Sequence, residues 1–165
     1  MQQQSVKHFK QWIEECFFLG VTWNDVIDKV DVDVFNGEWG YCEDPQEGFI
    51  PTIVCEGQWT PPILKPIIDK VADNFDYNRV HTYISFAKSK TLGRHNDTMD
   101  VFIVNVLGIV KYKFDDGTEV TLEPGDGIHI PKGVYHNPSV IGPRCSLSFS
   151  CLLYTSPSPR DRPLS

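Results

Sequence analysis

Two histidines and one aspartate in the second half of the chain have the residue types and spacing of a metal centre. His95 and Asp97 are two residues apart, so in an extended segment their side chains leave the same side of the backbone. His136 follows the turn-forming residues 131–133 and begins a predicted strand. Two imidazoles and one carboxylate on one side of a metal leave its other positions open, which suits non-haem Fe(II) that binds a co-substrate and oxygen together. The alternative is that His95 and Asp97 lie in a solvated surface turn. The presence of a third possible ligand, His136, after turn residues further along the chain favours the metal site.

The first half of the chain, which must support this centre, has mostly helical periodicity. Apolar residues from Val6 to Phe17 recur at helical spacing and predict an amphipathic helix that ends near Gly20, and residues 22–30 predict a second, short helix. Residues 35–48 form a loop rich in Gly, Asp and Pro, a candidate lid over a pocket.

A strand at 49–55 then leads into a further helix, for which Thr60 is the predicted N-cap. The predicted buried side of this helix comprises Ile63, Leu64, Ile67, Ile68, Val71, Ala72 and Phe75.

Beyond residue 76 the period changes to two, which is typical of strands. The predicted strands cover residues 80–86, 101–106, 111–114, 119–122, 127–130 and 145–151, and turn residues separate them. Helices first and short strands afterwards favour an α+β fold, in which a β-barrel-like jelly roll is flanked by N-terminal helices. We expect one domain over residues 1–151, with a helical N-terminal part at 1–76 and a jelly-roll core at 78–151.

Composition excludes several classes of protein. The chain has 165 residues, 41% of them hydrophobic, and a formal charge of −7, which argues against a broad nucleic-acid-binding surface. No segment has the pattern of a membrane span or of a signal peptide, so we expect no membrane partner. An odd number of cysteines without metal-motif spacing favours a reducing compartment, and we expect a cytoplasmic protein; they are Cys16, Cys42, Cys55, Cys145 and Cys151.

The last stretch of the chain differs in character from the rest. Residues 152–165 contain three prolines and no apolar period. The string LLYTSPSPRD at 152–161 resembles translated sequencing adaptor. We therefore expect residues after about Cys151 to be non-native or disordered, and the natural C-terminus to be missing.

One segment resembles the metal-binding strand of JmjC-type, cupin-like oxygenases, above all those of the ribosomal-oxygenase branch: residues 95–108, HNDTMDVFIVNVLG. Residues 125–136, with Gly125, Pro131 and Gly133 before His136, match the second cupin motif of that family. The resemblance covers roughly residues 80–149. It implies a double-stranded β-helix that holds Fe(II) through His95, Asp97 and His136, with 2-oxoglutarate on the metal and O₂ oxidising a C–H bond.

The chain departs from this family at the site that binds the distal carboxylate of 2-oxoglutarate. The family's basic residue, two positions after the glycine matched by Gly108, is Val110 here. Related 2-oxoglutarate enzymes instead use an Arg-x-Ser pattern after the distal histidine, and Arg144-Cys145-Ser146 fits it. Tyr83 and Asn105 are further candidates for the same pocket, and a plain surface arginine is the alternative for Arg144.

These observations predict an Fe(II)- and 2-oxoglutarate-dependent dioxygenase, a hydroxylase that converts 2-oxoglutarate to succinate. Its partners would be 2-oxoglutarate, O₂ and a small-molecule, peptide or protein substrate. One alternative is a metal-dependent cupin, a dioxygenase or isomerase without 2-oxoglutarate; such cupins usually carry His-x-His and a following Glu, where this chain has Asp97 and Val101. The other is a non-catalytic cupin-like binding module.

Overall fold

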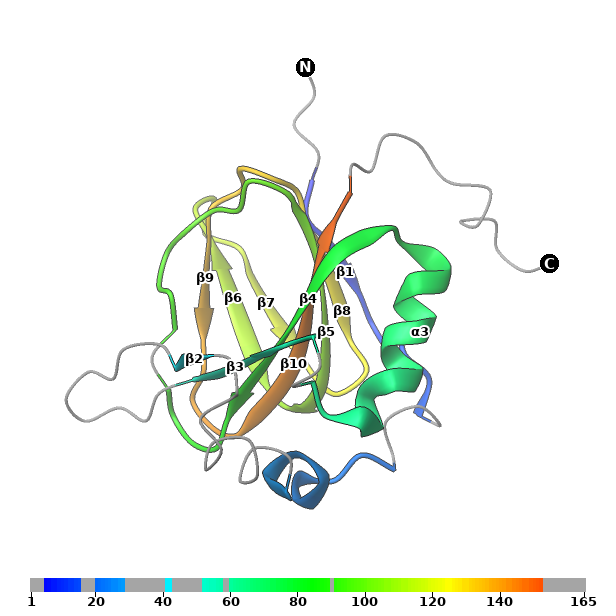
Figure 1. The fold of residues 1–165 in the computed structure, drawn as a ribbon. Helices are drawn as coiled ribbons and strands as arrows, with labels where there is room; N and C mark the ends of the chain where they lie inside the picture. Colours follow the sequence, from blue (N-terminus) through cyan, green and yellow to red (C-terminus); the bar gives the residue numbers. More distant parts are fainter. Residues whose placement is uncertain are drawn as a thin grey trace.

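Two antiparallel β-sheets face each other in the computed structural model, which describes residues 5–15, 20–28, 41–42, 52–57, 60–89 and 91–152 (Figure 1). The larger sheet has seven strands in the order β1-β8-β5-β10-β4-β3-β2, and the smaller has three in the order β7-β6-β9. This arrangement is a jelly roll of the cupin type, which confirms the predicted fold. Residues 153–165 of the predicted tail and most of the predicted 35–48 loop lie outside the described residues.

The strands and helices have the following bounds. The larger sheet contains β1 (Lys7–Phe9), β2 (Tyr41–Cys42), β3 (Ile53–Glu56), β4 (Tyr77–Ser85), β5 (Asp100–Gly108), β8 (Gly127–Ile130) and β10 (Arg144–Cys151). The smaller sheet contains β6 (Val110–Phe114), β7 (Glu119–Leu122) and β9 (His136–Ser139). A 3₁₀ turn, η2 (Pro62–Leu64), precedes the helix α3 (Lys65–Asn74), and residues 23–28 are also helical. No described helix has the length and apolar character needed to cross a bilayer.

The period-two pattern of β5 divides its side chains between two cores. Val101 and Ile103 belong to a buried cluster that joins the facing sheets, together with Val110, Tyr112, Phe114, Leu122, Ile128 and Ile130. Phe102 and Val104 point the other way, into a second cluster that α3 completes with Ile67. The helix therefore covers the outer face of the larger sheet, and the space between the sheets is left for a site (Figure 1).

Strand β10 lies in the middle of the larger sheet, between β4 and β5. At its first residue, Arg144 pairs with Ser85 on one side and Gly108 on the other. A register shift on the β5 side follows Cys145. Among the described strands, β10 alone connects the half formed by β1, β8 and β5 with the half formed by β4, β3 and β2.

The predicted N-terminal amphipathic helix is wrong at its start. Lys7–Phe9 forms the edge strand β1, which pairs with β8 through Lys7 and His129, among others. Phe9 and Trp12 pack edge-on against Phe102, with ring centroids 6.1 and 4.8 Å apart respectively. Pairing with a free sheet edge and burial of these rings outweigh the local helical spacing, which a single sequence cannot reveal.

The prediction that Thr60 is the N-cap of the helix that follows it is also wrong. The helical segment starts as a 3₁₀ turn at Pro62, and Thr60 makes no capping hydrogen bond. Ile63 and Ala72, which are predicted on the buried side, are exposed. The buried stripe of this helix is formed by Leu64, Ile67 and Val71.

Candidate metal centre

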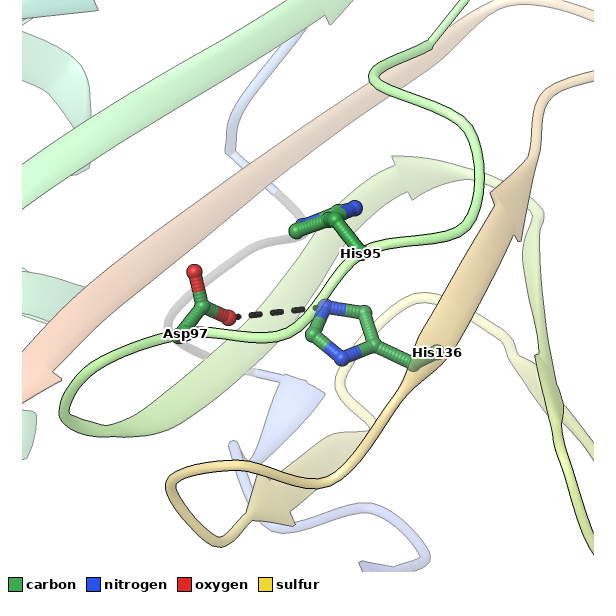
Figure 2. A group of neighbouring side chains, drawn as sticks. All are labelled: His95, Asp97 and His136. Atoms are coloured by element: carbon green, nitrogen blue, oxygen red, sulfur yellow. Dashed lines mark ion pairs between the residues drawn. The ribbon is translucent and has the colours of Figure 1, made fainter.

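His95, Asp97 and His136 form the one cluster of potential metal ligands among the described residues (Figure 2). One ligand atom from each residue lies within 4.8 Å of the other two. Asp97 Oδ2 is 3.5 Å from His136 Nε2, and the two imidazole centroids are 4.4 Å apart. The structure therefore brings together the three residues that the sequence analysis singled out as candidate ligands.

Backbone hydrogen bonds hold the two ligand-bearing segments together. The N–H of His95 donates to the carbonyl of His136 over 2.9 Å, and the N–H of His136 donates back over 2.8 Å. The N–H of Gly133 donates to the carbonyl of Asp97 over 2.9 Å. Gly133 adopts φ 79°, a left-handed conformation that glycine accepts without strain. All three candidate ligands are thus fixed by main-chain contacts between residues 95–97 and 133–136.

Each histidine is oriented by a carbonyl group close to it in sequence. His95 Nδ1 lies 2.8 Å from the carbonyl oxygen of Gly93, and His136 Nδ1 lies 3.0 Å from that of Val134. Because a carbonyl oxygen only accepts, both Nδ1 atoms must carry the proton. In neutral rings the lone pairs then lie on Nε2, which is the arrangement that metal-binding histidines use.

The electrostatics of the cluster favour a cation between the ligands. Burial and the neighbouring His95 lower the pKa of His136, although the hydrogen bond to Val134 and the charge of Asp97 act in the opposite direction. A neutral His136 places an unprotonated Nε2 opposite the carboxylate of Asp97, and two acceptors at 3.5 Å repel each other. A metal ion between them removes this repulsion.

The donor set fits a divalent metal. Nitrogen and carboxylate ligands lie about 2.1 Å from such an ion, so three donors on one face of it are about 3 Å apart, and the three side chains, whose ligand atoms lie within 4.8 Å of one another, would close inward around the ion. Two imidazoles and one carboxylate leave open coordination positions, which is the pattern of non-haem iron centres. The chain therefore has the residues for a facial two-histidine, one-carboxylate site.

A cavity opens from the metal centre into the space between the sheets. It contains about 510 Å³ of empty space, part of it open to solvent. Its lining combines the three candidate ligands with side chains of five strands and the 91–92 loop: Tyr83, Thr91, Leu92, Val101, Ile103, Tyr112, Pro138, Arg144 and Ser148.

Arg144 provides the positive charge of this cavity. Its side chain is almost fully buried, with 3% of the residue exposed, so the alternative of a surface arginine does not hold. Its Nε donates to Ser85 Oγ over 3.3 Å, and Ser85 Oγ lies 3.2 Å from Thr52 Oγ1. The guanidinium also lies over the ring of Tyr83, 5.2 Å from its centroid. These contacts orient the guanidinium within the cavity wall.

Two of the residues predicted for the co-substrate pocket do not line the cavity. Ser146 and Asn105 are fully buried and bond to each other, with Ser146 Oγ donating to Asn105 Oδ1 over 2.9 Å. The amide nitrogen of Asn105 donates to the carbonyls of Gly108 and Leu122 over 2.7 and 3.2 Å. The pair therefore links β5, β7 and β10.

Tyr112 is a cavity residue that the sequence reasoning missed. It is buried, and burial raises the pKa of its hydroxyl, while Arg144 lowers that pKa and Asp97 raises it. Tyr112, Arg144 and Asp97 line the same cavity. The signal was present in the sequence, because Tyr112 lies two residues after Val110 and shares its strand face.

Comparison with known proteins supports the fold. No protein-family model and no curated protein match the sequence. YcfD of Escherichia coli is similar, at a TM-score of 0.59 and 16% identity over 94% of this chain and 51% of YcfD. YcfD in complex with cobalt and 2-oxoglutarate matches with a TM-score of 0.47 and 20% identity, covering 71% of this chain and 37% of YcfD. A cupin superfamily protein from Desulfitobacterium hafniense matches with a TM-score of 0.45 and 12% identity. That match covers 67% of this chain and 84% of the other protein.

This chain spans about half the length of YcfD. What the chain shares with that ribosomal oxygenase is the jelly-roll fold of the cupins.

Proposed function

We propose that this chain is an Fe(II)- and 2-oxoglutarate-dependent oxygenase that hydroxylates a small molecule or a side chain of a peptide or protein. The observation that carries the proposal is the presence, in one cavity, of a candidate facial metal triad and a buried arginine. Two of the structurally similar chains are complexes of YcfD, one with cobalt and 2-oxoglutarate and the other with cobalt and succinic acid.

His95, Asp97 and His136 would hold the metal. The protonated Nδ1 atoms leave both Nε2 lone pairs available, and the Asp97 carboxylate would offset part of the ion's charge. When bound, Fe(II) with 2-oxoglutarate supplies the oxidative chemistry, in which 2-oxoglutarate and O₂ become succinate and CO₂ and one oxygen atom enters a substrate C–H bond.

Arg144 would bind the distal carboxylate of 2-oxoglutarate. Its Nε donates to Ser85 Oγ, and its side chain lines the cavity. A guanidinium in a buried site binds a carboxylate strongly because each N–H bond is charge-assisted and solvent competes little. The Tyr112 hydroxyl would add a hydrogen bond, a role that we do not assign to Ser146 or Asn105 because neither of them lines the cavity.

The rest of the lining would orient the substrate and limit water. Leu92, Val101, Ile103 and Pro138 form apolar walls close to the candidate ligands. Leu92 is 57% exposed and lies at the open end of the cavity. Apolar walls exclude water from the reacting atoms and favour contact with the C–H bonds of a substrate.

The test is an anaerobic titration of the protein with Fe(II) and then with 2-oxoglutarate. A chelated 2-oxoacid on Fe(II) gives a visible metal-to-ligand charge-transfer band, and we expect this band in the parent protein. Asp97→Ala should abolish it, whereas Arg144→Ala should retain iron binding and need a higher 2-oxoglutarate concentration for the same band.

Matched controls come from exposed residues of the same types. Asp69→Ala on α3 and Arg79→Ala on β4 each remove one half of a surface ion pair and should leave the titration unchanged. Iron binding without a band would refute the role of 2-oxoglutarate and favour a metal-dependent cupin of another type. Failure to bind iron would favour a non-catalytic module.

A further inference from the structure

Asp100 and His129 form a buried pair beside the metal centre that the proposed chemistry does not use. His129 Nε2 lies 3.0 Å from Asp100 Oδ2, and the side chains are only 8% and 11% exposed. The other carboxylate oxygen, Oδ1, accepts the backbone N–H of Lys132 over 2.9 Å. A single carboxylate thus joins the start of β5, strand β8 and the turn at 131–134.

The segments that Asp100 joins are those that carry the candidate ligands. Asp100 follows Asp97 by three residues, and Lys132 precedes His136 by four. Between them, the N–H of Gly133 donates to the carbonyl of Asp97. Two adjacent amides of one turn therefore hold the two ends of residues 97–100. The N–H of Lys132 binds the side chain of Asp100, and the N–H of Gly133 binds the main chain of Asp97.

We propose that Asp100 is a positioning residue for the metal centre, with His129 holding its carboxylate in place. This inference rests on the metal site of the proposed function. The side chain of Asp97 is 36% exposed, against 3% for that of His136, and no described side-chain hydrogen bond orients the Asp97 carboxylate besides the contact with His136. The position of the Asp97 carboxylate therefore depends on the backbone of residues 97–100. Asp100 fixes that backbone through its contacts with His129 and Lys132.

The expected effect is on metal affinity. Loss of outer groups that orient metal ligands typically weakens metal binding about 10- to 100-fold. Asp100→Ala removes both interactions of the carboxylate, so we expect an effect in that range. Asp100→Asn keeps an oxygen acceptor for the Lys132 N–H and should recover a large part of the lost affinity.

The experiment measures Co(II) binding and the visible spectrum of bound Co(II), which reports coordination geometry without requiring turnover. The variants are Asp100→Ala, Asp100→Asn and His129→Gln, with unfolding curves for each. Asp126→Ala is the matched control: Asp126 is also a buried aspartate that accepts backbone N–H groups, from Gln11 and Glu123, but it lies at another turn. Amide exchange of Gly133 in the metal-free protein gives a second readout.

We expect Asp100→Ala to weaken Co(II) binding, alter the Co(II) spectrum and speed exchange at Gly133, while Asp126→Ala lowers stability and leaves the Co(II) spectrum unchanged. If Asp100→Ala does not fold, weaker Co(II) binding and a changed spectrum in Asp100→Asn and His129→Gln carry the same conclusion. Co(II) binding with parent affinity and spectrum in folded Asp100 and His129 variants overturns the positioning role alone. A parent protein that binds no Co(II) overturns the metal centre and the positioning role together.

Discussion

Replacing Gly108 with alanine should be one of the most destabilising small substitutions in this chain. Gly108 ends β5 with φ 69°, and a Cβ atom there would lie 1.8 Å from the backbone oxygen of Pro143 and 3.1 Å from the Cα of Arg144. Atoms cannot approach to 1.8 Å without a bond, and the obstacle is backbone rather than a flexible side chain. The β5–β10 pairing at Arg144 must therefore open.

Two terms set the magnitude for Gly108→Ala. A non-glycine residue in the left-handed region costs roughly 1–2 kcal/mol. Forcing an extra methyl into a filled site costs roughly 1–3 kcal/mol more. Gly117 provides the matched control, because it has φ 87° and no atom within 4 Å of the added Cβ. Gly117→Ala should thus show only the first term.

The assay is equilibrium denaturant unfolding of both variants, with Trp fluorescence as the probe. We expect Gly108→Ala to lose roughly 2–5 kcal/mol of unfolding free energy and Gly117→Ala roughly 1–2 kcal/mol. Since Gly108 pairs with Arg144, 2-oxoglutarate binding should also weaken more than metal binding in the folded fraction. Equal losses in the two variants would refute the close approach to Pro143 as the cause.

Three further predictions follow from the site and its supports. Ser85→Ala removes the hydroxyl that accepts the hydrogen bond from Arg144 Nε. The apparent 2-oxoglutarate affinity in the Fe(II) titration should therefore fall about 2- to 13-fold, the equivalent of roughly 0.5–1.5 kcal/mol, while the Fe(II) affinity stays unchanged. An unchanged 2-oxoglutarate affinity would count against the role of Arg144 in binding the co-substrate. Co(II) at about 100 times its dissociation constant should add about 2.7 kcal/mol to the unfolding free energy of the parent protein, and a similar gain in Asp97→Ala would contradict the ligand assignment. Burial raises the pKa of Asp126, but backbone hydrogen bonds from Gln11 and Glu123, together with the charges of Lys10 and His8, lower it by more, so the pKa of the folded state lies below the ordinary value. The ionised carboxylate therefore stabilises the fold at pH values above its unfolded pKa of about 3.9. This stabilisation disappears as the pH falls through the lower pKa of the folded state. Unfolding curves of the parent and Asp126→Asn should accordingly differ at about pH 6 and converge in strong acid, and a constant difference would refute the linkage.

Local patterns were sufficient for most of the jelly roll. Strands 119–122 and 127–130 are found with their predicted bounds because alternating apolar residues and turn residues at both ends determine them locally. The motif around His95 and His136 likewise indicated residues that the fold brings into one cluster. Motifs of this kind succeed because the main-chain geometry of a ligand-bearing strand constrains residue spacing.

The misses share a physical cause, since each depends on a partner distant in sequence. Lys7–Phe9 is a strand only because β8 offers it an edge. Ser146 and Asn105 point toward each other, which reflects the pairing of β10 with β5. Tyr112 reaches the cavity of Arg144 because the smaller sheet faces the larger one. Sheet order decides these relations, and one sequence does not specify it.

The central place of β10 has a consequence for how the protein is made. During synthesis, β4 and β5 leave the ribosome well before residues 144–151, yet in the sheet β10 lies between them. The two halves of the larger sheet must therefore wait with unpaired edges until this strand arrives, and the Arg144 side of the cavity forms at the same moment. Nascent chains that lack β10 would expose the edges of β4 and β5, and unpaired strand edges of this kind promote aggregation.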